Sequence, residues 1–154
     1  MRYLAFILLF ICSACTPKSN SNELTKADEL AAKALVQGIF DDVWGGLDST
    51  KILNYHTEDF VILENGEVWT NEEIKNYIRG ALERESNPTR INKMEYISME
   101  KYGESINMSY HNYADFMVAD TLAGKGQWLE SATAIKTNKG WRLKTMHSTW
   151  VPQR

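Results

Sequence analysis

Two side chains of this sequence have the chemistry of an acid or base in a ligand site, Glu64 and His147. Glu64 follows the apolar run 60–63, and a carboxylate beside an apolar wall has a raised pKa and can remove a proton next to a carbonyl group. His147 lies in the final alternating run, 140–151, and a neutral imidazole donates, accepts or ligates. Each also has a structural interpretation, Glu64 as a solvated turn acid and His147 as a histidine hydrogen-bonded within a sheet.

Aromatic residues are abundant, with five tryptophans and seven tyrosines among 154 residues. Aromatic rings supply large apolar areas with a polar handle, which suits a ligand cavity as well as a core. The sequence therefore predicts a pocket whose wall contains His147 and five aromatic residues, with simple core packing as the alternative for each ring: Trp44, Trp69, Tyr110, Trp128 and Trp150.

Several classes of site are not expected from the composition. The three histidines, His56, His111 and His147, are widely separated, and both cysteines lie in the first fifteen residues, so we expect no metal site and no bound cofactor. No glycine-rich phosphate loop or Gly-x-Ser-x-Gly motif is present. The net charge is −3 without a basic block, which argues against nucleic acid as a partner.

The first fifteen residues have the pattern of an export signal. A positive start precedes eight apolar residues, far fewer than the roughly 20 that span a bilayer. The segment Cys12-Ser13-Ala14-Cys15 resembles the lipobox of bacterial lipoproteins, which implies a signal peptide over 1–14, acylation of Cys15 and a flexible linker over 15–22. The alternative is an ordinary signal peptide that leaves Cys15 free. The lipobox resemblance implies an envelope location, the outer membrane in preference because Thr16 is not the aspartate of inner-membrane retention.

The rest of the chain, residues 23–154, reads as helices followed by strands. Apolar spacing predicts a long helix over 23–47, a short one ending at His56, and a third over 71–85 that begins with a capping box of Thr70 and Glu73. Alternating residues predict strands over 60–63, 67–69, 91–99, 105–118, 128–137 and 140–151, with a turn at 124–126. The order predicts an α+β fold.

In the last strand, alternation places one set of side chains on a single face: Trp141, Leu143, Thr145, His147 and Thr149. The opposite face receives the other set, Arg142, Lys144, Met146, Ser148 and Trp150.

The order and spacing of several motifs resemble a SnoaL-like domain of the nuclear transport factor two-like superfamily. The first half matches at 44–48, 58–64 and 72–74, and the second at 128–131, 135–136, 140–141 and 147–149. The resemblance implies three helices packed on a curved antiparallel sheet, a cone with an internal pocket, and a homodimer formed through the sheet. It also implies that Glu64 stands where steroid-isomerase relatives carry a general base, and that Phe40 replaces their oxyanion-binding tyrosine.

Three functions follow as hypotheses. The first is a non-enzymatic lipoprotein that binds a small apolar or amphipathic molecule, and it leads because the transferable catalytic set is incomplete. The second is an enzyme of the isomerase or hydratase type that uses Glu64 or His147 as acid or base. The third is a dimeric module that docks a partner protein. The first two separate on whether Glu64 and His147 converge on one cavity.

Overall fold

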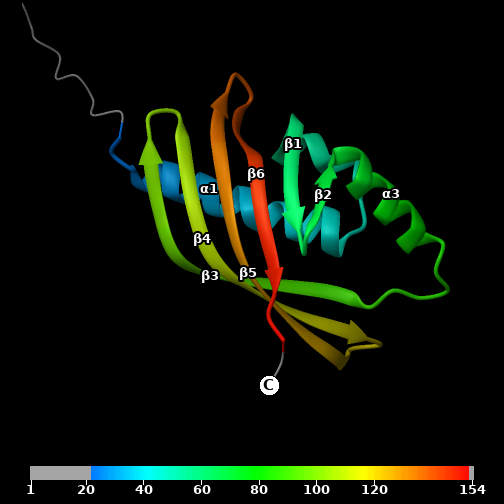
Figure 1. Ribbon diagram of the computed structural model, residues 1–154. Coiled ribbons are helices and arrows are strands. Elements are labelled where there is room, and N and C mark those ends of the chain that lie inside the picture. Colours follow the sequence, from blue (N-terminus) through cyan, green and yellow to red (C-terminus); the bar gives the residue numbers. More distant parts are fainter. Residues whose placement is uncertain (1–21, 153–154) are drawn as a thin grey trace, which may run out of the picture.

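The computed structural model describes residues 22–152, in which helical segments come first and long strands follow (Figure 1). The predictions for residues 1–14, for Cys15 and for most of the linker lie outside the described residues. The elements in chain order are α1 (Lys26–Gly38), η1 (Ile39–Gly45), η2 (Ser49–Lys51), α2 (Ile52–Tyr55), β1 (His56–Glu64), β2 (Glu67–Thr70), α3 (Asn71–Leu82), β3 (Thr89–Tyr102), β4 (Ser105–Val118), β5 (Thr121–Thr137) and β6 (Gly140–Trp150).

The six strands form one curved sheet in the order β2-β1-β6-β5-β4-β3. Strands β3 to β6 pair antiparallel as a meander, but β1 runs parallel to β6, so the sheet is mixed where an antiparallel one was expected. Among residues 22–152, strands β2 and β3 form the two edges of the sheet, which is not closed. The α+β cone with helices on one face of the sheet is otherwise as predicted, and α1 runs across that face in Figure 1.

Local sequence signals explain the helix starts. Thr25 caps α1 by accepting a hydrogen bond from the backbone N–H of Asp28 at 3.1 Å. The predicted capping box is present at α3, where the Glu73 carboxylate accepts from the Thr70 backbone N–H at 2.8 Å. Helix α3 ends three residues earlier than predicted, at Leu82.

The long first helix changes character after Gly38 and continues as the π-helical segment η1. Gly45, at its end, lies against β3: a Cβ there would be 2.8 Å from the carbonyl oxygen of Arg90. Any side chain at this position would push η1 away from β3. This close approach brings Phe40 and Trp44 of η1 next to Arg90.

The turn between β4 and β5 differs from the prediction. It lies at Ala119 and Asp120, whose φ angles of 46° and 61° resemble those of a type I′ hairpin turn. Gly124 and Gly126 lie inside β5 instead. A Cβ on Gly126 would be 2.6 Å from the ring of Trp128, so this glycine makes room for the indole.

Strand β6 contains a bulge that the alternation did not predict. Thr133 pairs with Thr145 while Ala134 pairs with Leu143, so Lys144 is an additional residue in β6. A one-residue insertion exchanges the faces of all later side chains. Every position of β6 after Lys144 therefore faces the side opposite to the predicted one.

The buried positions of β6 follow this exchange. Leu143 is buried before the bulge, whereas Met146 and Ser148 are buried after it and His147 is exposed. The prediction that His147 shares a face with Leu143 is therefore wrong.

The core lies between the helices and the concave face of the sheet. Its largest fully buried side chains come from both layers: Val36, Ile39, Val43, Ile52, Phe60, Ile74, Ile78, Ile106, Met108, Tyr110 and Leu143. The core fills one part of the concave side. Toward the other part, where η1 faces β3, β5 and β6, it gives way to a cavity.

Candidate functional site

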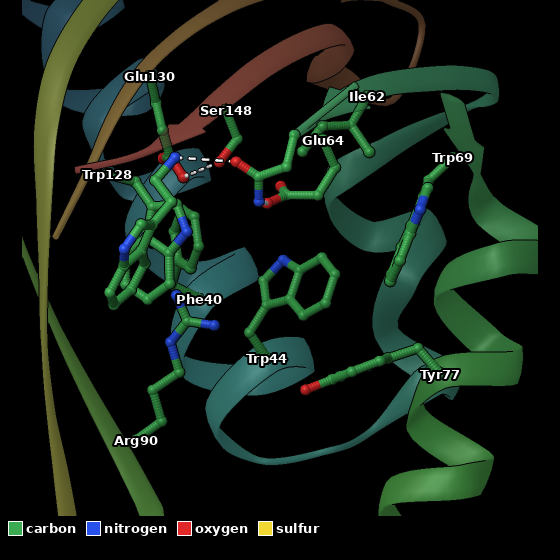
Figure 2. A pocket seen from close by; sticks show the side chains of 12 residues that line it. Phe40, Trp44, Ile62, Glu64, Trp69, Tyr77, Arg90, Trp128, Glu130 and Ser148 are labelled. Carbon is green, nitrogen blue, oxygen red and sulfur yellow. Dashed lines mark hydrogen bonds between the residues drawn. The ribbon is translucent and has the colours of Figure 1, made fainter. Parts of the chain in front are cut away.

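A cavity of about 260 Å³ lies between η1, α3 and the concave face of the sheet (Figure 2). Half of its twelve lining residues are aromatic, and five of the others are charged or polar. The lining residues are Phe40, Trp44, Ile62, Glu64, Asn65, Trp69, Tyr77, Arg90, Trp128, Glu130, Ser148 and Trp150. A small aromatic-lined cavity with few polar groups has the general character of a ligand site.

The rings form two groups. The first, which we call the aromatic corner, consists of Trp44, Trp69 and Tyr77, with ring centroids 5.7–6.5 Å apart and mutually tilted planes. The second is the pair of Trp128 and Trp150, which meet edge to face at 4.9 Å. Tilted and edge-to-face arrangements are favoured between aromatic rings, so both groups are stable walls.

Arg90 is the cation of this site. Its guanidinium lies 4.6 Å from the ring centroid of Trp128, 5.4 Å from that of Phe40 and 5.9 Å from that of Phe116. Its Nε is buried without a hydrogen-bond partner, and within residues 22–152 no carboxylate forms an ion pair with it. Burial lowers the pKa of Arg90, although an arginine stays charged in proteins. Aromatic rings hold the guanidinium, and no residue in the described part of the chain accepts a hydrogen bond from it.

Glu130 is a buried carboxyl group, with 5% of its surface exposed. Asn112 Nδ2 donates to both of its oxygens at 3.3 Å. Ser148 Oγ donates to Oε1 at 3.1 Å (Figure 2). Burial raises the pKa of Glu130 to about 7, against the opposing effect of these hydrogen bonds and of Arg90. At neutral pH this carboxyl group is therefore close to half protonated.

A hydrogen bond with Asn92 fixes the orientation of the Asn112 amide. Asn92 Nδ2 donates to Asn112 Oδ1 at 2.6 Å, which leaves the amide nitrogen of Asn112 facing Glu130. Asn92 and Asn112 are both buried. A chain of three side chains from β3, β4 and β5 thus holds the Glu130 carboxyl group in place.

Glu64 lines the same cavity from the end of β1, as the sequence suggested for an acid beside an apolar wall. Burial raises its pKa, while a hydrogen bond with Ser148 and the charges of Arg90 and His147 act in the opposite direction. The adjoining turn is anchored by Asn65, whose Nδ2 donates to Glu64 Oε1 at 2.7 Å and whose Oδ1 accepts from the Trp150 backbone N–H at 2.9 Å.

The structure separates His147 from Glu64. His147 is exposed and borders a different pocket on the outer face of the sheet, together with Ile97 and Leu129. The bulge at Lys144 is the reason, because it turns Ser148 toward the cavity in place of His147. Glu64 and His147 therefore do not line one cavity.

The predicted pocket aromatics divide in the same way. Trp44, Trp69, Trp128 and Trp150 line the cavity, whereas Tyr110 is fully buried in the core. Phe40 lines the cavity as well, with a ring that carries no hydroxyl.

Sequence reasoning missed Arg90, Glu130 and Ser148. For Glu130 a signal was present, because it follows Trp128 by two positions and so shares its face of β5. Ser148 has the same relation to Trp150. Arg90 had no comparable signal, since it lies at the start of β3 directly after a loop.

Within the described range 22–152, no three potential ligands from His, Cys, Asp and Glu gather closely enough to hold a metal ion. The same residues include no helix with the length and hydropathy needed to cross a membrane.

Comparisons with known proteins identify the fold. No protein-family model matches the chain, and no curated protein matches it. Among solved structures, a protein of unknown function with a cystatin-like fold from Nostoc punctiforme is 16% identical, covers 85% of this chain and 96% of its own, and has a TM-score of 0.69.

Two further structures agree. The CaMKII hub homology domain of Chlamydomonas reinhardtii is 18% identical over 80% of this chain and 98% of its own, with a TM-score of 0.70. An NTF2-like protein from Cytophaga hutchinsonii is 12% identical over 82% and 99%, with a TM-score of 0.60. The chain therefore has the cone fold that NTF2-like and cystatin-like structures share.

Proposed function

We propose that this protein binds a small, largely apolar molecule with one polar group in the aromatic cavity, without transforming it. The observation that carries the proposal is the cavity itself, where aromatic walls surround a guanidinium whose Nε is buried without a hydrogen-bond partner among residues 22–152. Such a group has lost water on burial and gains hydrogen bonds only when a ligand or solvent molecule enters.

The proposal includes the cellular context that the sequence predicts. The lipobox-like residues 12–15 support acylation of Cys15 and attachment to the bacterial envelope, preferably the outer membrane. One acyl chain holds a protein only marginally to a membrane, whereas two or more hold it stably. The order of motifs supports a SnoaL-like member of the cone fold, a superfamily in which one fold hosts many activities.

An acid–base enzyme is the second candidate, and Glu130 favours it. A carboxyl group with a pKa of about 7 beside an apolar cavity is suited to proton transfer at neutral pH. The candidate acids are now Glu64 and Glu130, since His147 lies on the outer face. Phe40 supplies no hydroxyl for an oxyanion, so the Arg90 guanidinium and the Tyr77 hydroxyl, which both line the cavity, are the candidate donors.

A docking module is the third candidate. Two of the similar folds are named after the CaMKII hub, and on the outer face of the sheet Ile97 and Leu129 are 58% and 46% exposed. Exposed apolar residues on one sheet face are compatible with a homodimer or a protein partner.

The test of the binding function is native mass spectrometry of the mature protein, purified gently from a membrane preparation of the bacterial envelope. We expect a co-purifying small molecule that is lost in Trp44→Ala, because Trp44 belongs to the aromatic corner. His147→Ala is the matched control and retains the molecule, since His147 lies outside the cavity.

Intrinsic fluorescence gives an independent measurement, because four of the five tryptophans line the cavity. A chain that carries nothing, and whose fluorescence no small aromatic probe alters, would contradict the binding function. A probe that is converted during the titration would favour the enzyme.

A further inference from the structure

We propose that the occupant of the cavity is an organic acid whose carboxylate pairs with Arg90 while its apolar body rests in the aromatic corner, and that Glu130 takes up a proton when this acid binds. The inference rests on the proposed binding function and names the ligand class of that site. Three features of the cavity carry it: the state of Arg90, the composition of the walls and the surroundings of Glu130.

Arg90 is arranged to receive a planar anion. A guanidinium carries five donors in a rigid fork that fits a carboxylate with two parallel hydrogen bonds. Here the fork lies over the Trp128 ring and beside Phe40, and no described residue uses its donors. Because the rings fix the guanidinium before a ligand enters, little side-chain entropy remains to be lost on binding.

The walls select a small acid with an apolar body. Arg90 is the only Lys or Arg among the lining residues, so a multiply charged phosphate ester lacks the several cations that usually hold it. The aromatic corner offers ring faces to the part of the ligand that carries no charge. A volume of about 260 Å³ suits a molecule of one ring and a short side arm.

Glu130 is the charge that an entering carboxylate meets. The charged and titratable groups around it are Arg90 and Tyr96 from β3, Tyr110 from β4 and, across the cavity, Glu64 from β1. A ligand carboxylate shares the single guanidinium with two carboxyl groups, and like charges in a buried site do not all ionise.

The proton that relieves this repulsion goes to Glu130 and comes from the solvent. The pKa of Glu130 is about 7 in the empty cavity, and a neighbouring anion raises it further. Below pH 7 Glu130 already holds its proton and binding takes up little. Above pH 7 binding takes up as much as about one proton, and affinity falls by at most about tenfold per pH unit.

The experiment is isothermal titration calorimetry of the full chain at pH 8, in two buffers of different ionisation enthalpy. Three probes share one apolar body and differ in the head group: phenylacetate, phenylacetamide and phenethylamine. We expect phenylacetate to bind at least about tenfold more tightly than the amide, because a hydrogen-bonded charge pair replaces a neutral contact. We also expect proton uptake with phenylacetate only.

Variants separate the two roles. Arg90→Met removes the preference for the acid, and Arg90→Lys retains part of it, because a lysine keeps the charge without the fork. Lys93→Met on the same strand is the matched control, since Lys93 is exposed and paired with Glu95, and it changes nothing. Glu130→Gln keeps the preference for the acid and abolishes proton uptake.

The outcomes distinguish this inference from the binding function on which it rests. Equal binding of acid and amide, or tighter binding of the amine, overturns the inference and leaves small-molecule binding standing. Unchanged acid preference in a folded Arg90→Met protein also overturns it. Proton uptake that persists in Glu130→Gln overturns the role of Glu130. Failure of all three probes to bind the folded protein contradicts the inference and counts against the binding function too.

Discussion

The two faces of strands β5 and β6 differ in how far their side chains are exposed to solvent. On the concave face, Glu130 and Ser148 are buried and bonded to each other, and burial raises the pKa of Glu130 to about 7. On the outer face, the neighbouring His147 and Leu129 are exposed to solvent. Residues adjacent in sequence thus belong either to a desolvated site or to an open surface, and the difference arises from strand register alone.

The largest difference in the free energy of unfolding is expected between substitutions at two neighbouring residues of β6, Met146 and His147. Met146→Ala removes a core side chain that is 4% exposed, and we expect the free energy of unfolding to fall by about 2–5 kcal/mol. His147→Ala, one position later, is expected to change it by no more than about 0.5 kcal/mol. Urea denaturation of both variants measures the comparison. Equal losses would mean that the bulge at Lys144 is misplaced.

The second-largest expected effect concerns the dependence of stability on pH, to which Glu130 and His56 contribute with opposite signs. The folded pKa of Glu130, about 7, lies above its ordinary value of 4.5, so its contribution is complete below about pH 4.5 and is lost as the pH rises to about 7. His56 has the opposite slope: burial lowers its pKa from 6.5 to about 4, so stability is gained as the pH rises between those values.

Glu130→Gln removes the first of these slopes and leaves the second. We expect the variant to gain stability from pH 4 to pH 6.5 more steeply than the wild type, and to exceed it at pH 8 by up to about 3 kcal/mol. Thermal unfolding followed across this pH range provides the measurement. Parallel curves for the two proteins would show that Glu130 ionises as an ordinary surface acid.

Two asparagines on β4, the buried Asn112 and the exposed Asn107, allow the same comparison of a buried with an exposed polar side chain. Asn112→Ala leaves both Glu130 and Asn92 short of a partner, and we expect a loss of about 1–3 kcal/mol. Asn107→Ala on the same strand removes an exposed side chain that accepts only from Thr133, and a loss below about 0.5 kcal/mol is expected. Chemical denaturation of the pair decides whether the buried network contributes to stability.

The smallest effect on folding is expected on the outer face. Leu129→Glu places a charge where the wild-type leucine is 46% exposed, so we expect the free energy of unfolding to change by no more than about 0.5 kcal/mol. If this face forms an interface between two copies, the same substitution dissociates them, and analytical ultracentrifugation detects the change. A wild type that sediments as a monomer would remove the homodimer hypothesis.

Sequence alone predicted the elements with strong local signals. Thr70 and Glu73 located the start of α3, and alternation over 105–118 predicted β4 with the bounds that it has. In these segments capping, periodicity and burial agree, so a local pattern is sufficient.

The site was less predictable because it depends on pairing between distant strands. The bulge at Lys144 follows from how β6 meets both β1 and β5, and nothing in the sequence of β6 alone marks it. Arg90 becomes a pocket residue only because Gly45 lets η1 approach β3. Four of the six aromatic lining residues were predicted from the sequence, whereas Arg90 and Glu130, two of the charged groups of the wall, were not.

The position of β6 has a consequence for the order of assembly. This last strand lies in the middle of the sheet, between β1 and β5, so residues 140–150 leave the ribosome or an export channel after everything that they join. Until then β1 and β2 have no lateral connection to the meander, and the cavity lacks Ser148 and Trp150. We expect folding to be slow, as is usual for distant pairings, and to follow synthesis of residues 140–150. A chain that ends before Gly140 would then be a target for proteases and not a smaller working domain.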